Sequence, residues 1–179
     1  MYDKLLVPID FSTCSALVAG QAGELARVHG ASVLLLHVAQ SPSGLRRDLR
    51  IADDRGQATT VADYLLQEAQ DAMPAYAAAA AAHGVEVESR VELGEVVEVI
   101  RRVADEASAD LIVMGTHGRK GLARAVLGSV AERTLRTADV PVLIVRRKPR
   151  PECSHDACDW CPHGRVTDGE LAVSAELEG

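Results

Sequence analysis

The sequence predicts an α/β fold in which helices cover both faces of a doubly wound, mostly parallel five-stranded sheet. Hydrophobic residues make up 47% of the 179 positions but aromatic residues only 3%, so the core is expected to be aliphatic, as in parallel sheets covered by helices. Short apolar runs also alternate with segments of helical periodicity. Because strand-helix-strand crossovers are right-handed, this order of elements predicts a doubly wound sheet.

The first part of the chain predicts a strand, a helix, a second strand and a long loop. The apolar run at residues 4–9 stops at Asp10, and Ser12 offers an N-cap for a helix through about residue 28. Residues 32–38 form a second continuous apolar run, of the kind buried on both faces of a parallel sheet. Residues 39–57 lack apolar periodicity, which predicts a long loop.

The middle of the chain predicts a helix, an edge strand and another helix. Apolar residues recur at helical spacing from about residue 59 to 82, with Pro74 expected to kink the helix or divide it in two. Apolar and charged residues alternate over residues 85–91, which is typical of a half-exposed strand at a sheet edge. Residues 95–107 place their apolar residues on one helical face and acids at the helix start, where the dipole favours them.

The last part predicts a buried strand at residues 111–114, a glycine-bearing segment, a helix at residues 129–137 and a final strand at residues 140–145. Ligands of such sheets bind at the carboxyl ends of the strands, where the strand order reverses. Asp10 and Gly115 both follow predicted strands. The sequence therefore predicts a binding site that includes these two positions.

Composition excludes several functional classes. The formal net charge of −7 offers no basic footprint for nucleic acid. No uncharged apolar stretch reaches the roughly 18 residues that a membrane span needs. The N-terminal residues 1–10 lack the apolar region of a secretory signal, so a cytoplasmic location is expected.

Three glycines punctuate the segment between the fourth strand and the last helix. Two residues separate Gly115 from Gly118, nine separate Gly118 from Gly128, and Ser129 follows. Glycines let backbone N–H groups approach an anion, and the N-terminus of the following helix attracts phosphate. The segment is thus predicted to hold a polyphosphate, although it matches neither the P-loop pattern nor the Rossmann glycine pattern at the first strand.

A structural alternative stays open for the same segment. Ser129 and Glu132 have the spacing of a capping box, and Gly115 fits a tight turn after a strand, so the loop could hold no ligand. Arg119 and Lys120 could add positive charge at a phosphate or simply face solvent.

The stretch THGRKGLARAVLGSVAERTLRTADVPVLIV resembles the C-terminal signature of the universal stress protein family. The pattern G-x2-G-x9-G-[ST], which marks the ATP-binding branch, is complete at Gly115, Gly118, Gly128 and Ser129. The likeness covers residues 1–147, which are interpreted as the family domain, and leaves residues 148–179 as a C-terminal extension. It implies a Rossmann-like, adenine nucleotide α-hydrolase-like sheet of strand order 3-2-1-4-5.

The resemblance also implies ATP as the ligand. Asp10 would accept hydrogen bonds from ribose hydroxyls, Val38 would meet adenine through backbone groups, and the glycine segment would hold the phosphates with Mg²⁺ or Mn²⁺. The implied ATP-binding residues are Pro8, Ile9, Asp10, Val38, Met114, Gly115, His117, Gly118, Arg119, Gly128, Ser129 and Val130. Turn formation is the alternative for Asp10, and His117 could be an ordinary loop residue. His37, inside a predicted buried strand, is interpreted as a packed core histidine.

In this family the last strand pairs with its copy across a two-fold axis. For this chain the resemblance therefore implies a homodimer through Val140 to Val145, which would cover an otherwise exposed edge.

The extension carries a cluster of cysteine and histidine residues that the resemblance does not explain. Its candidate metal ligands are Cys153, His155, Cys158, Cys161 and His163. Three thiolates and one imidazole are the donor set of a tetrahedral zinc site, but C-x4-C-x2-C-x-H is not a standard finger spacing. Thiol redox sensing and an unstructured tail are the alternatives.

The leading functional hypothesis is a regulatory protein that reports energy or stress through ATP occupancy. The sequence shows no paired acid and base, nucleophile elbow or catalytic lysine, so at most slow ATP hydrolysis is expected, and enzyme status stays open. The second hypothesis is a metal- or redox-responsive interaction module that uses the α/β domain as a scaffold. A phosphorelay receiver is disfavoured because it needs an acidic pair after the first strand, where this chain has Asp10 alone. The sequence names no downstream protein partner.

Overall fold

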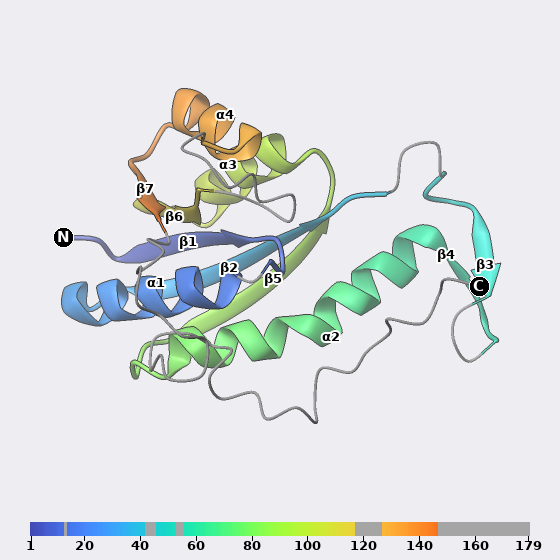
Figure 1. Cartoon of the computed structure of the whole chain (residues 1–179), viewed down its shortest axis with the longest axis horizontal. Helices are drawn as coiled ribbons and strands as arrows, with labels where there is room; N and C mark the ends of the chain where they lie inside the picture. The colour runs from blue at the N-terminus through green and yellow to red at the C-terminus, as the bar shows by residue number, and fades with distance from the viewer. Residues whose placement is uncertain (13, 42–45, 53–55, 117–126, 147–179) are drawn as a thin grey trace, which may run out of the picture. The chain divides into compact units, whose positions relative to one another are not determined.

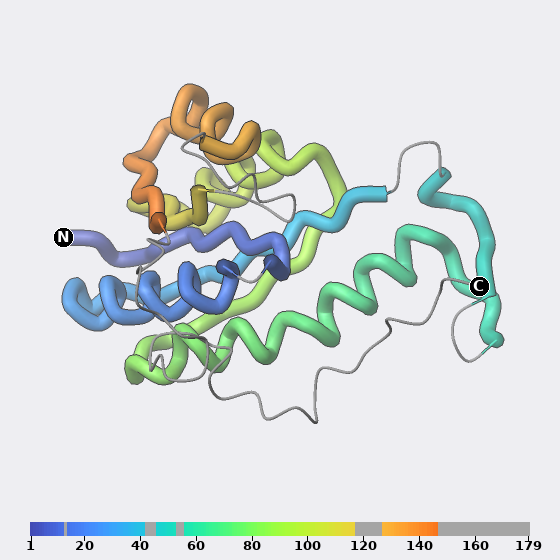
Figure 2. The backbone as a smooth tube through the Cα atoms, in the orientation of Figure 1, coloured from blue at the N-terminus to red at the C-terminus, as the bar shows by residue number. Residues whose placement is uncertain are grey.

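The computed structural model describes residues 1–12, 14–41, 46–52, 56–116 and 127–146 (Figures 1 and 2). Four helices and seven strands lie in these ranges. The strands are β1 (Lys4–Ile9), β2 (Ser32–Ala39), β3 (Arg50–Ala52), β4 (Ala58–Thr60), β5 (Val87–Leu93), β6 (Leu111–Gly115) and β7 (Val142–Val145). The helices are α1 (Ser15–His29), α2 (Val61–Ala81), α3 (Val96–Glu106) and α4 (Ser129–Thr137).

Five strands form one sheet in the order β5-β2-β1-β6-β7, and every neighbouring pair is parallel. When the five strands predicted from the sequence are numbered along the chain, this order is 3-2-1-4-5. The predicted fold class is therefore confirmed. β5 lies at one edge of this sheet, as the alternating pattern of residues 85–91 predicts, and β7 lies at the other.

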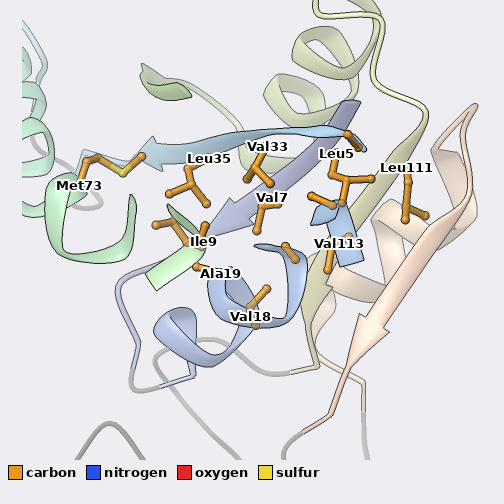
Figure 3. Packing of buried hydrophobic residues seen from close by; sticks show 14 residues of the cluster. Leu5, Val7, Ile9, Val18, Ala19, Val33, Leu35, Met73, Leu111 and Val113 are labelled. Carbon is orange, nitrogen blue, oxygen red and sulfur yellow. The ribbon is translucent and has the colours of Figure 1, made fainter. Parts of the chain in front are cut away.

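Two apolar clusters fill the spaces between the sheet and its helices. The first packs one face of β1 against α1 and α2, and Figure 3 shows Leu5, Val7 and Ile9 of β1 pointing into it beside Val18 of α1. The second packs the other face against α3 and α4, with Leu6 of β1 as a member. Figure 1 shows the two helix pairs on opposite faces of the sheet. Successive side chains of β1 point to opposite faces of the sheet, so this one strand contributes to both apolar clusters.

The first helix begins later than the sequence predicts. α1 starts at Ser15 after the N-cap residue Cys14, which makes no side-chain capping bond. Ser12 is therefore not the cap: it lies two residues earlier, in the turn that precedes the helix, where its carbonyl accepts a hydrogen bond from Ser15 N (2.9 Å). Phe11 in the same turn has φ 59°, a left-handed backbone that a helix excludes.

The predicted long loop at residues 39–57 is partly wrong, because it contains a strand. β3 pairs with β4 in an antiparallel ribbon, with Arg50 opposite Thr60 and Ala52 opposite Ala58. Each of these strands has three residues, which is too short to show a period-two pattern. Thr60 then caps α2, since its Oγ1 accepts a hydrogen bond from Asp63 N (3.1 Å).

Helix α2 continues through Pro74, so of the two expected effects, a kink or a division, the division is wrong. Pro74 is exposed. The alanine-rich end of α2 lies close to α1: a Cβ on Gly23 would lie 2.9 Å from Ala80 Cα. Small residues therefore allow the two helices to approach closely. In the part of the chain that the structure describes, no helix has both the length and the apolarity to cross a membrane.

Candidate functional site

The candidate site lies at the carboxyl edge of the three central strands. β1 lies between β2 and β6, and all three run parallel, so their carboxyl ends meet at one edge of the sheet. The chain reverses its direction of strand addition at β1: β2 follows on one side, and β6 returns on the other. This is the switch point where doubly wound sheets bind ligands.

The structure brings together six of the residues that the sequence singles out. They lie at the ends of β1, β2 and β6, and they are Pro8, Ile9, Asp10, Val38, Met114 and Gly115. Ile9 and Met114 are buried, whereas Asp10 and Gly115 are half-buried. The two residues inside the strands are therefore shielded from solvent, and the two at the strand ends are partly exposed.

Asp10 is held in place by the turn that follows β1. One oxygen of its carboxylate, Oδ1, accepts hydrogen bonds from Ser12 N (3.1 Å) and Ser15 Oγ (3.0 Å), and Asp10 N donates to Ser15 Oγ (3.3 Å). The turn role considered for Asp10 is thus real. It does not exclude a ligand role, because an ionised carboxylate offers about four acceptor positions.

His37 is a packed core histidine, as the sequence analysis expects. Its side chain is buried, and Nδ1 lies 2.9 Å from Ile9 O on the neighbouring strand. Its ring stacks on Phe11 with a centroid separation of 3.8 Å. His37 therefore connects β2 to residues on both sides of Asp10.

The glycine segment begins and ends on described residues that lie close together. Gly128 N donates to Thr116 O (2.7 Å), which joins the end of β6 to the start of α4. Residues 117–126, between them, lie outside the described residues, and so do the predicted ligands His117, Gly118 and Arg119 as well as Lys120. The hydrogen bond holds the two described ends of the segment together at the carboxyl edge of the sheet.

The capping box suggested for α4 is wrong. Gly128 is the N-cap residue, with φ −63° and ψ 150°, and Ser129 is the first helical residue. No side chain of the described residues caps α4. Ser129 is exposed and Val130 is half-buried in the second apolar cluster. The start of α4 thus combines backbone N–H groups without a side-chain cap and a hydroxyl, which are the donors that a phosphate group needs.

An ion pair fastens the start of α4 to the start of α3. Arg133 Nη1 lies 2.9 Å from Glu95 Oε1, and Glu95 Oε2 accepts a hydrogen bond from Glu98 N (3.0 Å) as the cap of α3. The Glu98 backbone N–H and the Arg133 guanidinium hold the pKa of Glu95 below its ordinary value. Glu95 therefore stays ionised near neutral pH and maintains the contact between the two helices.

Sequence reasoning missed two features near this site. Phe11, whose ring lies between His37 and Tyr76, is the chain's single phenylalanine and follows Asp10 directly, which is a signal that could have identified it. The pairing of Glu95 with Arg133 joins residues 38 positions apart, and no local pattern predicts it.

The predicted metal ligands of the extension, Cys153 to His163, lie outside the described residues. Within the ranges that the structure does describe, no three His, Cys, Asp or Glu side chains gather as a metal ion would require.

Comparison with known proteins identifies the family. The model of the universal stress protein family matches residues 1–146. Universal stress protein MJ0531 of Methanocaldococcus jannaschii is 35% identical over 154 residues, which cover 85% of this chain and 86% of that protein. Among solved structures, hypothetical protein MJ0577 of the same organism superposes with a TM-score of 0.67 at 26% identity, covering 84% of this chain and 99% of the other.

A third relative is a universal stress protein solved in complex with cAMP. It has a TM-score of 0.54 and 30% identity, and the alignment covers 80% of this chain and 97% of that one. The family match includes the strands whose ends form the candidate site. The chain belongs to the universal stress protein family.

Proposed function

We propose that this protein binds ATP at the carboxyl edge of β1, β2 and β6 and acts as a regulatory nucleotide sensor in a stress response. The observation that carries the proposal is the convergence of two features. The complete G-x2-G-x9-G-[ST] spacing starts at the end of β6, and it ends at the first turn of α4, which no described side chain caps. The cAMP complex of a relative supports a nucleotide as the ligand class.

In this proposal the site has two halves. The nucleoside half consists of Pro8, Ile9, Asp10 and Val38, with the Asp10 carboxylate accepting hydrogen bonds from the ribose. The phosphate half consists of Gly118, Arg119, Gly128, Ser129 and Val130. Met114 and Gly115 would lie beneath the nucleotide, and His117 belongs to the same motif. Bound at the phosphate half, Mg²⁺ or Mn²⁺ would neutralise part of the phosphate charge, and oxygen donors such as the Ser129 hydroxyl are the type of ligand that these ions accept.

The experiment separates ATP from other nucleotides and from the alternative function. The full-length protein is purified and denatured, released nucleotide is identified, and bound zinc and iron are measured in the same sample. Calorimetric titrations of the full-length protein, freed of nucleotide, with ATP, ADP and cAMP then rank affinities. We expect ATP to bind most tightly in the presence of Mg²⁺. If neither released nor titrated nucleotide is detected while zinc is bound stoichiometrically, the metal-responsive module replaces this proposal.

A substitution at Gly128 tests the location of the site. Gly128→Val places a side chain where the proposal puts phosphate, and its β-region backbone accepts valine without strain, so we expect ATP affinity to fall at least about a hundredfold. Gly20→Ala is the control, because a Cβ there would make an ordinary contact of 3.8 Å with Ala79 O. Wild-type affinity in a folded Gly128→Val protein would place the phosphates elsewhere.

We also propose that the protein is a homodimer joined through β7, with residues 140–145 of two copies facing each other. β7 is the end strand of the sheet, and its side chains are apolar. A cytoplasmic location is part of the same proposal, since a sensor of ATP must lie where ATP is abundant.

A further inference from the structure

The turn after β1 contains a backbone conformation that needs support. Phe11 has φ 59°, in the left-handed region that bulky side chains avoid. Such conformations persist where the surrounding structure holds them, and they cluster at functional sites. Phe11 directly follows Asp10, the residue proposed to contact ribose.

Two aromatic rings from other elements hold Phe11. The His37 ring, on β2, stacks against it with centroids 3.8 Å apart and an angle of 15° between the planes. The Tyr76 ring, on α2, stacks against it with centroids 5.2 Å apart and an angle of 27°. Phe11 therefore takes its position from a strand and a helix that are distant in the sequence.

His37 also fixes the residue on the other side of Asp10. Its Nδ1 lies 2.9 Å from Ile9 O, so one buried side chain contacts residue 9 through a hydrogen bond and residue 11 through its ring. On the helical side, Ser12 N and Ser15 Oγ hold the carboxylate itself. The backbone at Asp10 is thus restrained before, at and after the residue.

We propose that the stack of Phe11, His37 and Tyr76 positions the Asp10 carboxylate, and so sets the preference of the site for nucleotides that carry ribose hydroxyls. The inference rests on the proposed function, because it assigns Phe11 and Tyr76 a role at the same site. Neither residue needs to touch the nucleotide. A carboxylate whose place is fixed in advance forms both ribose hydrogen bonds without an ordering cost, and that advantage disappears when the turn can move.

The test compares ATP with 2′,3′-dideoxy-ATP, which lacks both ribose hydroxyls. Calorimetric titrations use the full-length wild type, Phe11→Leu and Tyr76→Leu, with thermal unfolding as a check that each variant is folded. Tyr76→Leu keeps an apolar side chain on α2 and serves even where Phe11→Leu fails to fold. Tyr2→Leu is the matched control, because Tyr2 contacts His29 edge to face (5.0 Å), far from Asp10 along β1.

We expect the wild type to prefer ATP by about tenfold or more, as two hydrogen bonds to a charged acceptor would give. Phe11→Leu and Tyr76→Leu should weaken ATP binding several-fold and leave the dideoxy nucleotide almost unchanged. Asp10→Ala should remove the preference for ATP. Adding Phe11→Leu to Asp10→Ala should then cause no further loss of ATP affinity, since both substitutions act through the same ribose contact.

Other results overturn the inference. An equal loss of affinity for both nucleotides would mean that the stack is merely structural, and an unchanged preference would mean that it does not position Asp10. A wild type that binds the two nucleotides equally would refute the ribose contact while leaving nucleotide binding intact. Failure of the wild type to bind either nucleotide would instead refute the proposed function itself.

Discussion

The two edge strands of the sheet differ in chemistry. On β5, alternate residues on the face toward α3 are charged, namely Glu88, Arg90 and Glu92. On β7 the residues are Val142 to Val145, all apolar, and Leu143 is 42% exposed. Among the described strands, each of the two has one neighbour in the sheet. The difference lies in what surrounds their backbones.

Four charged side chains form a closed ring beside β5. Arg90 pairs with Glu92 and with Glu106 of α3 (2.7 Å to Oε2), while Arg102 of α3 pairs with both carboxylates at 2.8 Å. The ring fastens the strand to the helix. An incoming strand would have to approach charged groups whose partners are already in place, which is how natural proteins protect an edge.

The comparison indicates which edge is available for association. An exposed edge without charge is a template for pairing with another chain. Within the described residues, β5 carries the charged ring and β7 carries no charged side chain, which supports β7 as the proposed dimer contact and argues against β5 in that role.

The largest effect is expected at β7. Leu143→Glu places a carboxylate on each copy at the proposed two-fold contact, where like charges face each other and desolvation is costly. We expect the dimer to dissociate, with its dissociation constant raised at least about a hundredfold. Sedimentation velocity across protein concentrations measures this change.

Glu88→Gln on β5 is the matched control for that experiment. It changes charge on the opposite edge strand at an exposed residue, whose ion pair with Lys4 is long at 3.8 Å. The dimer should persist in this variant. If Glu88→Gln dissociates the dimer and Leu143→Glu does not, the contact lies on β5, and the assignment of the two edges is reversed.

A smaller effect is expected from opening the charged ring. Glu92→Gln removes the carboxylate that both guanidinium groups contact, and the side chain of Glu92 is only 20% exposed. We expect a loss of about 1 kcal/mol in unfolding free energy, since partly exposed ion pairs contribute little more than this. Urea denaturation in the Leu143→Glu background measures it without a contribution from dimerisation. No loss at all would mean that the ring protects the edge without stabilising the strand.

The ring should also make stability depend on pH. Hydrogen bonds from Arg102 and Arg90 hold the pKa of Glu106 below its ordinary value. Burial alone would raise the pKa of Glu92, but its hydrogen bonds to Arg102 and Arg90 outweigh that and lower it. Because both folded-state pKa values are lowered, this stability is present above the unfolded pKa of about 4.3 and is lost as the pH falls through the folded values.

Urea denaturation of the Leu143→Glu protein at pH values from 7 downward tests this dependence. Stability should fall at acid pH, and the fall should be shallower when Glu92→Gln is added. Equal slopes in the two proteins would show that the ring carboxylates do not cause the acid sensitivity.

Much of the sheet could be predicted because its signals are local. The apolar runs of β1, β2 and β6 and the alternation of β5 each lie within one short segment, and right-handed crossovers then predict a doubly wound sheet. The strand order itself was expected only from the family resemblance. The end of α4 at Thr137 and its start at Ser129 were also predicted. The start of α1 was not, because the turn at Phe11 depends on rings from β2 and α2.

The candidate site also has a part that local sequence predicts and a part that depends on distant contacts. The strand-end positions Asp10 and Gly115 follow from the pattern of strands. The contacts that support the site do not, since Phe11 with Tyr76 and Glu95 with Arg133 join residues far apart in the sequence. A capping box looked plausible at Ser129 because its spacing fits, but the backbone places the cap at Gly128.

The smallest effect is expected from a charged pair near the β7 edge that is not part of a ring. Arg136 and Glu132 lie one turn apart on α4 at 2.9 Å, with side chains 75% and 51% exposed. Arg136→Gln should cost about 0.3 kcal/mol, the usual value of such a pair on a helix surface, and leave dimerisation unchanged. Urea denaturation and sedimentation measure the two quantities. If Arg136→Gln lowers the unfolding free energy as much as Glu92→Gln does, the ring stabilises the protein no more than an isolated ion pair. The two edges would then differ only in the charge that they carry.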